Sequence, residues 1–228
     1  IRIEGRPSVR WSGKPVVVPG DLSAAAFFLA GASIVPDSDV TICNVGMNPT
    51  RTGLIDILLQ MGAHIEVLNP REEAGEPVAD LRVLSRPLHG VRIGPEQIPQ
   101  TIDEFPVLCV AAAVAEGETV ITGAEELRVK ESDRIATMAK ELRAMGARIE
   151  ERPDGMVIQG LGRSGANGAL TGATCESHGD HRVAMSVAIG GLTAGQATQI
   201  HHTDCIETSF PNFEHKLLEL LTDSGKCL

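Results

Sequence analysis

An internal repeat constrains the fold of this chain more than any other feature of its sequence. Asp21, Asp103 and Asp180 lie 82 and 77 residues apart, and each stands just before an Ala-rich apolar run. After each run come a Gly or Pro break, a short β-branched run and a second helical pattern. Self-similarity at a regular spacing is the signature of a repeated supersecondary unit, so the sequence predicts one α/β unit built three times.

The two helical patterns of each unit differ in their apolar distribution. The first is apolar nearly all round, which is typical of a helix buried in the core. The second is amphipathic, and corresponding second helices end on the same Met-Gly-Ala sequence, at Met61 and at Met145. We therefore expect an α/β fold of three repeated units around buried helices, with an ordinary open α/β sheet as the alternative. In the second unit the i, i+3, i+4, i+7 spacing is formed by Ile135, Met138, Ala139, Leu142 and Met145.

The repeat divides one domain, residues 18–228, into three units. Their expected limits are about 18–75, 76–155 and 156–228. Two polar or Gly-rich stretches, 69–80 and 160–173, are expected as loops between units.

The first 17 residues belong to no unit. Ile1–Glu4 and Val16–Pro19 are expected as extended segments around a turn at Gly13. No stretch approaches the 18 or so apolar residues of a membrane span, and the first residues do not have the pattern of a signal peptide. We therefore expect no contact with a membrane.

Composition excludes several classes of partner. Asp+Glu 30 against Lys+Arg 20 gives a formal net charge of −10, which disfavours general binding to nucleic acid. Aromatic residues make up 3% of the chain, with no Tyr and one Trp, so surfaces for stacking bases are scarcely available. The five cysteines form an odd set without a C-x-x-C pair, and we expect a reducing, cytoplasmic location.

Each repeated Asp is a candidate N-cap, and the third one has the most informative neighbours. An Asp before a helix accepts hydrogen bonds from free backbone N–H groups, which is a purely structural role. Asp180, however, is followed by His181 and Arg182. A cation beside a helix N-terminus favours an anion, so Arg182 is the best single candidate for binding a phosphate or carboxylate.

A second charged cluster stands in residues 127–135, Leu-Arg-Val-Lys-Glu-Ser-Asp-Arg-Ile. We expect it to open a helix, on which Lys130 and Arg134 share a face and Glu131 contacts Arg134. Two cations could then hold a small anion while Glu131 gives or takes a proton. A solvated helix start with internal ion pairs is the alternative.

A metal site is the alternative to these anion sites. Cys175-x-x-His178-x-x-His181 and His201-His202-x-x-Cys205 contain zinc-type ligands, but their spacings match none of the usual structural zinc patterns. We therefore expect no metal. The sequence also has no G-x-S-x-G, P-loop, dinucleotide or H-E-x-x-H motif, and we expect no cofactor.

Five segments of the chain, taken together, resemble one enzyme family. They are Val18-Pro-Gly-Asp-Leu-Ser-Ala-Ala-Ala-Phe-Phe, Ile102-Asp-Glu-Phe-Pro, Arg128-Val-Lys-Glu-Ser-Asp-Arg-Ile, Gly179-Asp-His-Arg-Val-Ala-Met and Thr208-Ser-Phe-Pro-Asn-Phe. In this order they resemble the C-terminal half of the 3-phosphoshikimate 1-carboxyvinyltransferases, also called EPSP synthases. The resemblance implies two domains, each with three α/β units around parallel buried helices.

The resemblance also implies a reaction and its residues. A metal-independent transferase of the shikimate pathway to aromatic amino acids adds the 5-hydroxyl of shikimate 3-phosphate to phosphoenolpyruvate (PEP) and releases phosphate. By the same resemblance Asp103 contacts the shikimate hydroxyls and is a candidate base, and Glu131 is the acid that protonates PEP. Lys130, Arg134 and Arg182 bind the substrates, while Asp180 and His181 have possible secondary roles.

Two departures from the family pattern limit these expectations. Thr208 occupies a place where family members commonly have a Lys of the phosphate pocket. The family's N-terminal motifs are absent from the chain, so we expect half of an active site that is inactive alone and needs the N-terminal half. Three alternatives remain open: a non-catalytic half-enzyme with a separate N-terminal partner chain, another enolpyruvyl transferase such as the UDP-N-acetylglucosamine type, and a structural repeat domain.

Overall fold

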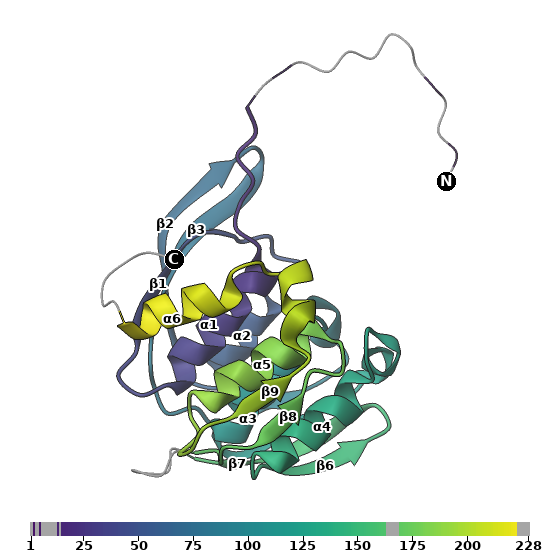
Figure 1. The fold of residues 1–228 in the computed structure, drawn as a ribbon. Helices are drawn as coiled ribbons and strands as arrows, with labels where there is room; N and C mark the ends of the chain where they lie inside the picture. The colour runs from purple at the N-terminus through teal and green to yellow at the C-terminus, as the bar shows by residue number, and fades with distance from the viewer. Residues whose placement is uncertain (1, 3–4, 6–12, 14, 163–168, 223–228) are drawn as a thin grey trace.

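The structure is a computed structural model that describes residues 2, 5, 13, 15–162 and 169–222 (Figure 1). The extended segment and turn expected before residue 15 lie largely outside these residues, and so do residues 163–168 of the loop expected at 160–173. Residues 160 and 161 of that expected loop form the end of a strand instead. In the described part of the chain, Val16–Pro19 form no strand. No helix among the described residues has the length and apolar character that a membrane span requires.

The first unit follows the predicted order of a buried helix, a strand and a second helix, and then adds a hairpin. Its three strands form an antiparallel sheet in the order β1-β3-β2. Its elements are α1 (Leu22–Ile34), β1 (Asp39–Gly46), α2 (Gly53–Gln60), β2 (His64–Glu73) and β3 (Glu76–Leu84).

The second unit repeats this order after a short leading strand. Its sheet has the order β4-β5-β7-β6, with β4 parallel to β5 and the other pairs antiparallel. Its elements are β4 (Arg92–Ile93), η1 (Ile98–Gln100), α3 (Phe105–Val114), β5 (Glu116–Ile121), η2 (Glu125–Val129), α4 (Arg134–Ala144), β6 (Arg148–Arg152) and β7 (Gly155–Leu161).

The third unit is shorter within the described residues. Its two strands pair in parallel, and its elements are β8 (Thr174–Glu176), α5 (His181–Gly191), β9 (Gln199–His201), η3 (Thr203–Thr208) and α6 (Phe213–Thr222). The sheets divide the chain later than the repeat suggested. Because β3 pairs with β1 and β2, and β7 with β5 and β6, residues 76–84 join the first unit and 155–161 the second.

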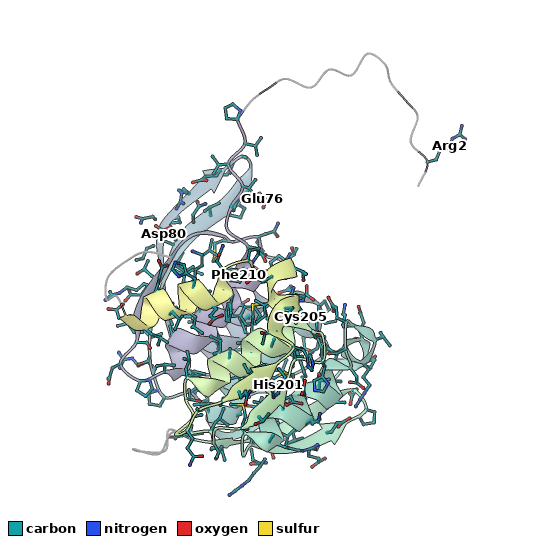
Figure 2. All side chains as sticks on the ribbon, viewed as in Figure 1. Arg2, Glu76, Asp80, His201, Cys205 and Phe210 are labelled. Atoms are coloured by element: carbon teal, nitrogen blue, oxygen red, sulfur yellow. The ribbon has the colours of Figure 1, made fainter. Side chains whose placement is uncertain are left out.

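The expectation of a loop at 69–80 was wrong, because β2 and β3 form a hairpin there. Ala74 and Gly75 at its tip have φ values of 53° and 87°, and such positive values at both residues suit a two-residue hairpin turn. Arg82 lies opposite Glu66 in the register and forms an ion pair with it. Polar composition alone suggested a loop, whereas cross-strand pairing stabilises the strands. Figure 2 shows Asp80 on this hairpin, away from His201 and Cys205 of the third unit.

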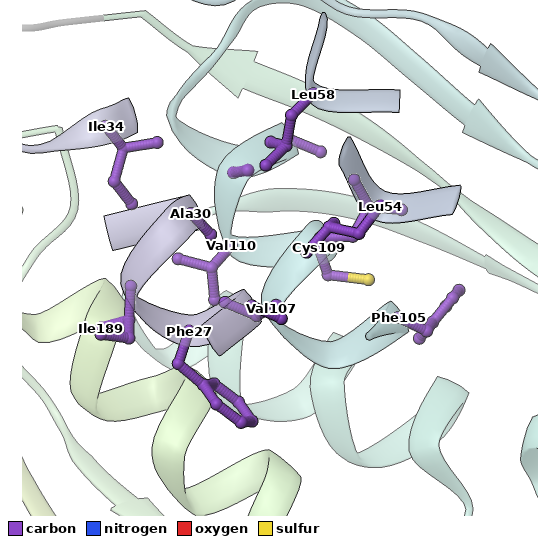
Figure 3. Close-up of a cluster of buried hydrophobic side chains, with 14 of the residues drawn as sticks. Phe27, Ala30, Ile34, Leu54, Leu58, Phe105, Val107, Cys109, Val110 and Ile189 are labelled. Carbon is purple, nitrogen blue, oxygen red and sulfur yellow. The ribbon is translucent and has the colours of Figure 1, made fainter. Parts of the chain in front are cut away.

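The three buried helices form the centre of the molecule, as expected. α1, α3 and α5 contact one another, and all ten residues of α3 are buried (Figure 3). Gly31 of α1 faces Ile189 of α5, where an added Cβ would lie 3.4 Å from the Ile189 Cδ1. This is an ordinary van der Waals distance, so the two helices are in direct contact at this crossing.

The shared Met-Gly-Ala sequence ends α2 and α4 in the same way. Gly62 and Gly146 have φ values of 94° and 87°, in the region that favours glycine. The amides of Ala63 and Ala147 donate to the carbonyls of Leu58 and Leu142, both at 2.9 Å. This is the hydrogen bond of a Schellman motif, so the repeated sequence encodes a repeated helix end.

Aromatic side chains join the last described helix to the first. Phe213 of α6 packs against Phe27 and Phe28 of α1, with ring centroids 6.0 and 5.7 Å apart. Phe210 completes the cluster against Phe28 and Phe213. Four of the five Phe residues of the chain therefore lie at this contact.

The cysteines differ in state. Cys109 and Cys175 are free and buried, and burial raises the pKa of the Cys109 thiol above its usual range and that of Cys175 to about 11. Both thiols are therefore protonated at neutral pH. Cys43 is disulfide-bonded, which does not fit the reducing location expected from the cysteines.

Candidate active site

The N-terminal ends of the three buried helices meet at one end of the core. Ser23 of α1 donates a hydrogen bond from Oγ to Glu104 Oε1, directly before α3. Arg182 of α5 donates from Nη1 to the Asp103 carbonyl at 2.9 Å. The three helices therefore run in parallel from this end, where free N–H groups and helix dipoles favour negative charge.

Asp180 holds the start of α5 and also neutralises a buried cation. Its Oδ1 accepts from the Arg182 amide at 2.9 Å, which confirms the expected N-cap. Its Oδ2 accepts from Arg134 Nε at 2.9 Å and from Ser132 Oγ at 3.0 Å. Burial opposes ionisation, but the hydrogen bond and charge of Arg134 outweigh it and lower the pKa of Asp180.

Arg134, the first residue of α4, is the most deeply buried cation among the described residues. Its side chain is 1% exposed, and Nη2 donates to Glu131 Oε2 at 2.7 Å, as predicted. Its Nη1 lies 3.6 Å from Asp103 Oδ1, and no described residue accepts a hydrogen bond from it. A buried guanidinium nitrogen without a hydrogen-bond acceptor is costly, so this atom is suited to an anionic ligand.

Asp103 does not cap its helix, contrary to the prediction. α3 begins at Phe105, and in the described chain neither Asp103 nor the N-cap residue Glu104 caps it with a side chain. The physical reason is Pro106, which stands at the second helical position and has no N–H to offer a cap. The Asp103 side chain, 41% exposed, instead faces Arg134 and lies 3.5 Å from Arg182 Nη2.

Lys130 and Arg134 do not share a helix face, so that prediction was also wrong. Asp133 caps α4 by accepting from the Ala136 amide at 3.0 Å, so the helix starts only at Arg134. Lys130 precedes the helix, and its Nζ donates to the exposed Glu126 at 2.8 Å. An Asp in this position is a strong N-cap, and it moves the helix start past Lys130.

Three residues near Arg182 were not found from the sequence. Glu104 Oε1 lies 3.9 Å from Arg182 Nη1, and burial is the main cause that raises the pKa of Glu104. Ser23 accepts from Arg51 Nη2 at 2.6 Å in addition to bonding Glu104. Ser23 and Glu104 lie in segments that resemble the family but received no role from the sequence, and Arg51 lies outside those segments. Their partners are distant in the sequence, so local patterns did not connect them.

His181 and Thr208 occupy less central places. His181 opens α5 half-buried, and burial together with the charge of Arg182 lowers the pKa of its imidazole. It is therefore neutral at pH 7. Thr208 ends η3 and donates from Oγ1 to the Cys205 carbonyl at 2.7 Å, so the place of the family Lys carries no charge.

Two of the four histidines in the possible zinc segments pair with carboxylates. His178 Nε2 lies 2.7 Å from Glu141 Oε1, and His202 Nδ1 lies 2.8 Å from Glu176 Oε2. Across the residues that the structure describes, no group of three His, Cys, Asp or Glu side chains could hold a metal ion.

The charged cluster is open and not enclosed. Glu131 and Asp103 are partly exposed, with side chains 52% and 41% accessible. The cavity beside His181 and Arg182 has a volume of about 20 Å³, enough for about one water molecule and not for a substrate. Binding of a substrate would require walls from outside the described residues.

Comparison with known proteins identifies the relatives of this chain. Residues 1–217 match the family described as EPSP synthase (3-phosphoshikimate 1-carboxyvinyltransferase). The enzymes of that name from Geobacter sulfurreducens and Synechococcus elongatus are 58% and 55% identical to it over 201 and 221 residues. These alignments cover 88% and 97% of this chain but 46% and 48% of the relatives, so the chain spans about half their length.

Solved structures agree with this assignment. An EPSP synthase from Acinetobacter baumannii superimposes with a TM-score of 0.87 at 49% identity, over 90% of this chain and 46% of that one. The enolpyruvyl transferase NikO from Streptomyces tendae shares the fold at 16% identity, with a TM-score of 0.67. From the match to nearly its whole length and from these relatives, the chain belongs to the EPSP synthase family.

Proposed function

We propose that this chain supplies the C-terminal half of the active site of an enzyme that transfers the enolpyruvyl group of PEP to the 5-hydroxyl of shikimate 3-phosphate. The observation that carries the proposal is the buried Arg134, whose Nη1 has no acceptor among the described residues. A guanidinium fork fixed in this way suits the planar carboxylate of PEP.

The proposed chemistry assigns proton transfers to the two exposed carboxyl groups. Glu131 donates a proton to C3 of PEP, while the 5-hydroxyl gives its proton to Asp103 and its oxygen bonds to C2. The bond from C2 to the phosphate oxygen then breaks, and phosphate leaves with the electron pair. Loss of one methyl proton to Glu131 restores the double bond, so the proposal needs no metal or cofactor.

The two arginines are proposed to bind PEP and to stabilise the charge that develops in this reaction. Arg134 and Arg182 lie on either side of Asp103, at 3.6 and 3.5 Å from its carboxylate oxygens. Both distances exceed that of a good hydrogen bond, so an incoming carboxylate can compete for the guanidinium groups. Preorganised cations of this kind are often the largest contribution to catalysis.

Lys130 is proposed to bind shikimate 3-phosphate, on the strength of the family resemblance. It now pairs with Glu126, whose side chain is 66% exposed. Such exposed pairs contribute little, about 0–1 kcal/mol, so a dianionic phosphate can displace Glu126. Asp180 and His181 are proposed to support Arg134 and Arg182 without contacting the reacting atoms.

The remaining walls of the site are proposed to come from the N-terminal half of the same enzyme. The open cluster and the coverage of about half of each relative support this proposal. Residues 1–17 would be the segment that joins the halves, and residues 18–228 the C-terminal domain. A separate N-terminal partner chain is the alternative, and a cytoplasmic location stays a prediction.

The test measures PEP-dependent phosphate release with shikimate 3-phosphate. We expect none from the 228-residue chain and activity after a matching N-terminal half is added; robust turnover by this chain alone would contradict the half-site. In the assembled enzyme, Glu131→Gln should lower turnover by about 10²–10⁴-fold, as expected for a general acid. Glu125→Gln is the matched control, and UDP-N-acetylglucosamine as acceptor tests the other transferase.

A further inference from the structure

Helix α4 carries two buried charged residues, Arg134 and Glu141, on the same face. They are seven residues apart, which is two helical turns, and the exposed fractions of the whole residues are 0% and 2%. Both contact the segment Glu176–Arg182, which leads into α5. Arg134 binds Asp180 near the end of this segment, and Glu141 binds its beginning.

Glu141 uses both carboxylate oxygens on this segment. Oε2 accepts from the Glu176 amide at 3.1 Å, and Oε1 lies 2.7 Å from His178 Nε2. Lys140 Nζ lies 3.4 Å from Oε1 and is largely exposed. Burial opposes the charge, but these contacts lower the pKa of Glu141, so the carboxylate is ionised at neutral pH.

The segment Glu176–Arg182 has an unusual backbone just before Asp180. His178 and Gly179 have φ values of 55° and 72°, and the conformation of His178 is one that a side chain with a Cβ rarely adopts. Such a conformation persists only where its surroundings hold it. On one side Ser177 donates from Oγ to the His202 carbonyl at 2.7 Å, and on the other Glu141 holds the His178 ring.

We propose that Glu141 is a positioning residue, which fixes the segment Glu176–His178 so that Asp180 and Arg182 stand in register with Arg134. Arg182 reaches from the first turn of α5 to the Asp103 carbonyl, so a shift of this turn moves its guanidinium directly. Glu141 contacts no proposed substrate, and its effect passes through the backbone. The part that concerns PEP rests on the proposed function.

The first experiment tests the positioning itself and needs no activity. Hydrogen exchange of the 228-residue chain should show the amides of 176–182 exchanging at least about tenfold faster in Glu141→Ala, while those of α1 keep wild-type rates. Glu150→Ala, an exposed Glu paired only with Arg152 among the described residues, is the matched control. Wild-type exchange at 176–182 in Glu141→Ala would overturn the proposal.

The second experiment measures PEP affinity by calorimetry in the enzyme assembled with its N-terminal half. Glu141→Ala should weaken PEP binding about tenfold or more, because small misplacements of a binding group are costly. Glu141→Gln should recover most of this loss, since its amide oxygen can still accept from the Glu176 N–H and its amide nitrogen can still contact the His178 ring. A purely structural residue would change the melting temperature and leave the affinity per folded molecule unchanged, and that result would overturn the proposal.

The proposal stays testable if Glu141→Ala does not fold or if the proposed function fails. If Glu141→Ala does not fold, His178→Ala takes its place, with a smaller loss in the same direction expected and wild-type affinity contradicting the proposal. If the assembled wild-type enzyme binds no PEP, the proposed function fails, while the exchange experiment still decides whether Glu141 fixes the segment.

Discussion

The starts of α5 and α3 look alike in the sequence and differ in the structure. Asp180 caps α5, is fully buried and binds Arg134. Asp103 stands one residue before the N-cap Glu104 of α3 and faces both arginines from a half-exposed position. The difference follows from the second helical residue, which is Arg182 in α5 and Pro106 in α3. One repeated landmark therefore stabilises the fold at one helix and is free for chemistry at the other.

The largest expected effect on stability comes from removing the buried carboxylate of Asp180. Asp180→Ala leaves the Arg134 guanidinium buried without its carboxylate and α5 without its cap. We expect the free energy of unfolding to fall by about 3–5 kcal/mol, as for a broken buried ion pair. Urea denaturation followed by circular dichroism measures it. Glu131→Ala removes the exposed partner of the same Arg134 and is the control, with an expected loss below about 1 kcal/mol.

Acid should gradually remove the contribution of ionised Asp180 to the free energy of unfolding. Because Arg134 lowers the pKa of Asp180 below its usual 3.8, the unfolded chain takes up this proton more readily than the folded one. The contribution is complete above that value and is lost as the pH falls through the folded pKa. The stability difference between wild type and Asp180→Asn should therefore be constant from about pH 5 to 7 and narrow below about pH 3.8. A constant difference down to about pH 2 would argue against an ionised Asp180.

Arg182 connects the two helix starts, and its loss should affect ligand binding more than folding. In the assembled enzyme, Arg182→Ala should weaken PEP binding by about 2 kcal/mol, the scale of a charge-assisted hydrogen bond, and shikimate 3-phosphate binding less. Arg182→Lys should recover only part of this, because an ammonium keeps the charge without the planar fork. Calorimetry with each ligand measures both values, and unchanged PEP affinity in the Ala variant would assign Arg182 to the fold alone.

An ordinary helix cap provides the intermediate case. Asp21 caps α1 by accepting from the amides of Ser23 and Ala24 at 3.3 and 3.2 Å, but it is exposed. Asp21→Ala should therefore cost about 1 kcal/mol of unfolding free energy, the usual value of a cap. Denaturation under the conditions used for Asp180→Ala gives the ratio directly, and equal losses would remove the distinction between a cap and a buried pair.

The smallest effect on stability is expected at Asp103. Asp103→Ala removes no cap, and its side-chain contacts with the arginines exceed 3.4 Å, so the change should be within about 0.5 kcal/mol. The same variant should nevertheless abolish most of the turnover of the assembled enzyme, by about 10²-fold or more. Thermal denaturation and the phosphate-release assay separate the two. A large loss of stability would place Asp103 with Asp180 as a structural residue.

Local patterns in the sequence predicted the parts of the fold that local physics decides. The repeat, the three buried helices and the contact of Glu131 with Arg134 are all confirmed. Each depends on periodicity or on residues three to four apart.

The errors have identifiable causes. Pro106 removed the cap at Asp103, and Asp133 moved the start of α4 beyond Lys130. Both residues were visible in the sequence, but competing rules for helix starts applied to them. The hairpin at 69–80 was missed because its charged residues pair across strands.

Glu104 and Glu141 could not have been found in the same way. Glu104 contacts Ser23, 81 positions away, and Glu141 contacts Glu176 and His178, more than thirty positions away. A buried carboxylate on an amphipathic helix looks like a surface residue until its partners are known. Only the packing of three units brings those partners together.

The Phe cluster has a consequence for how the chain is made. The apolar side of α1 that carries Phe27 and Phe28 is covered by Phe210 and Phe213, which are translated nearly two hundred residues later. At roughly 5–20 residues per second, that side of α1 waits on the order of 10–40 s for its cover. During synthesis this apolar surface therefore stays uncovered, and a chain truncated before Phe210 would keep it exposed.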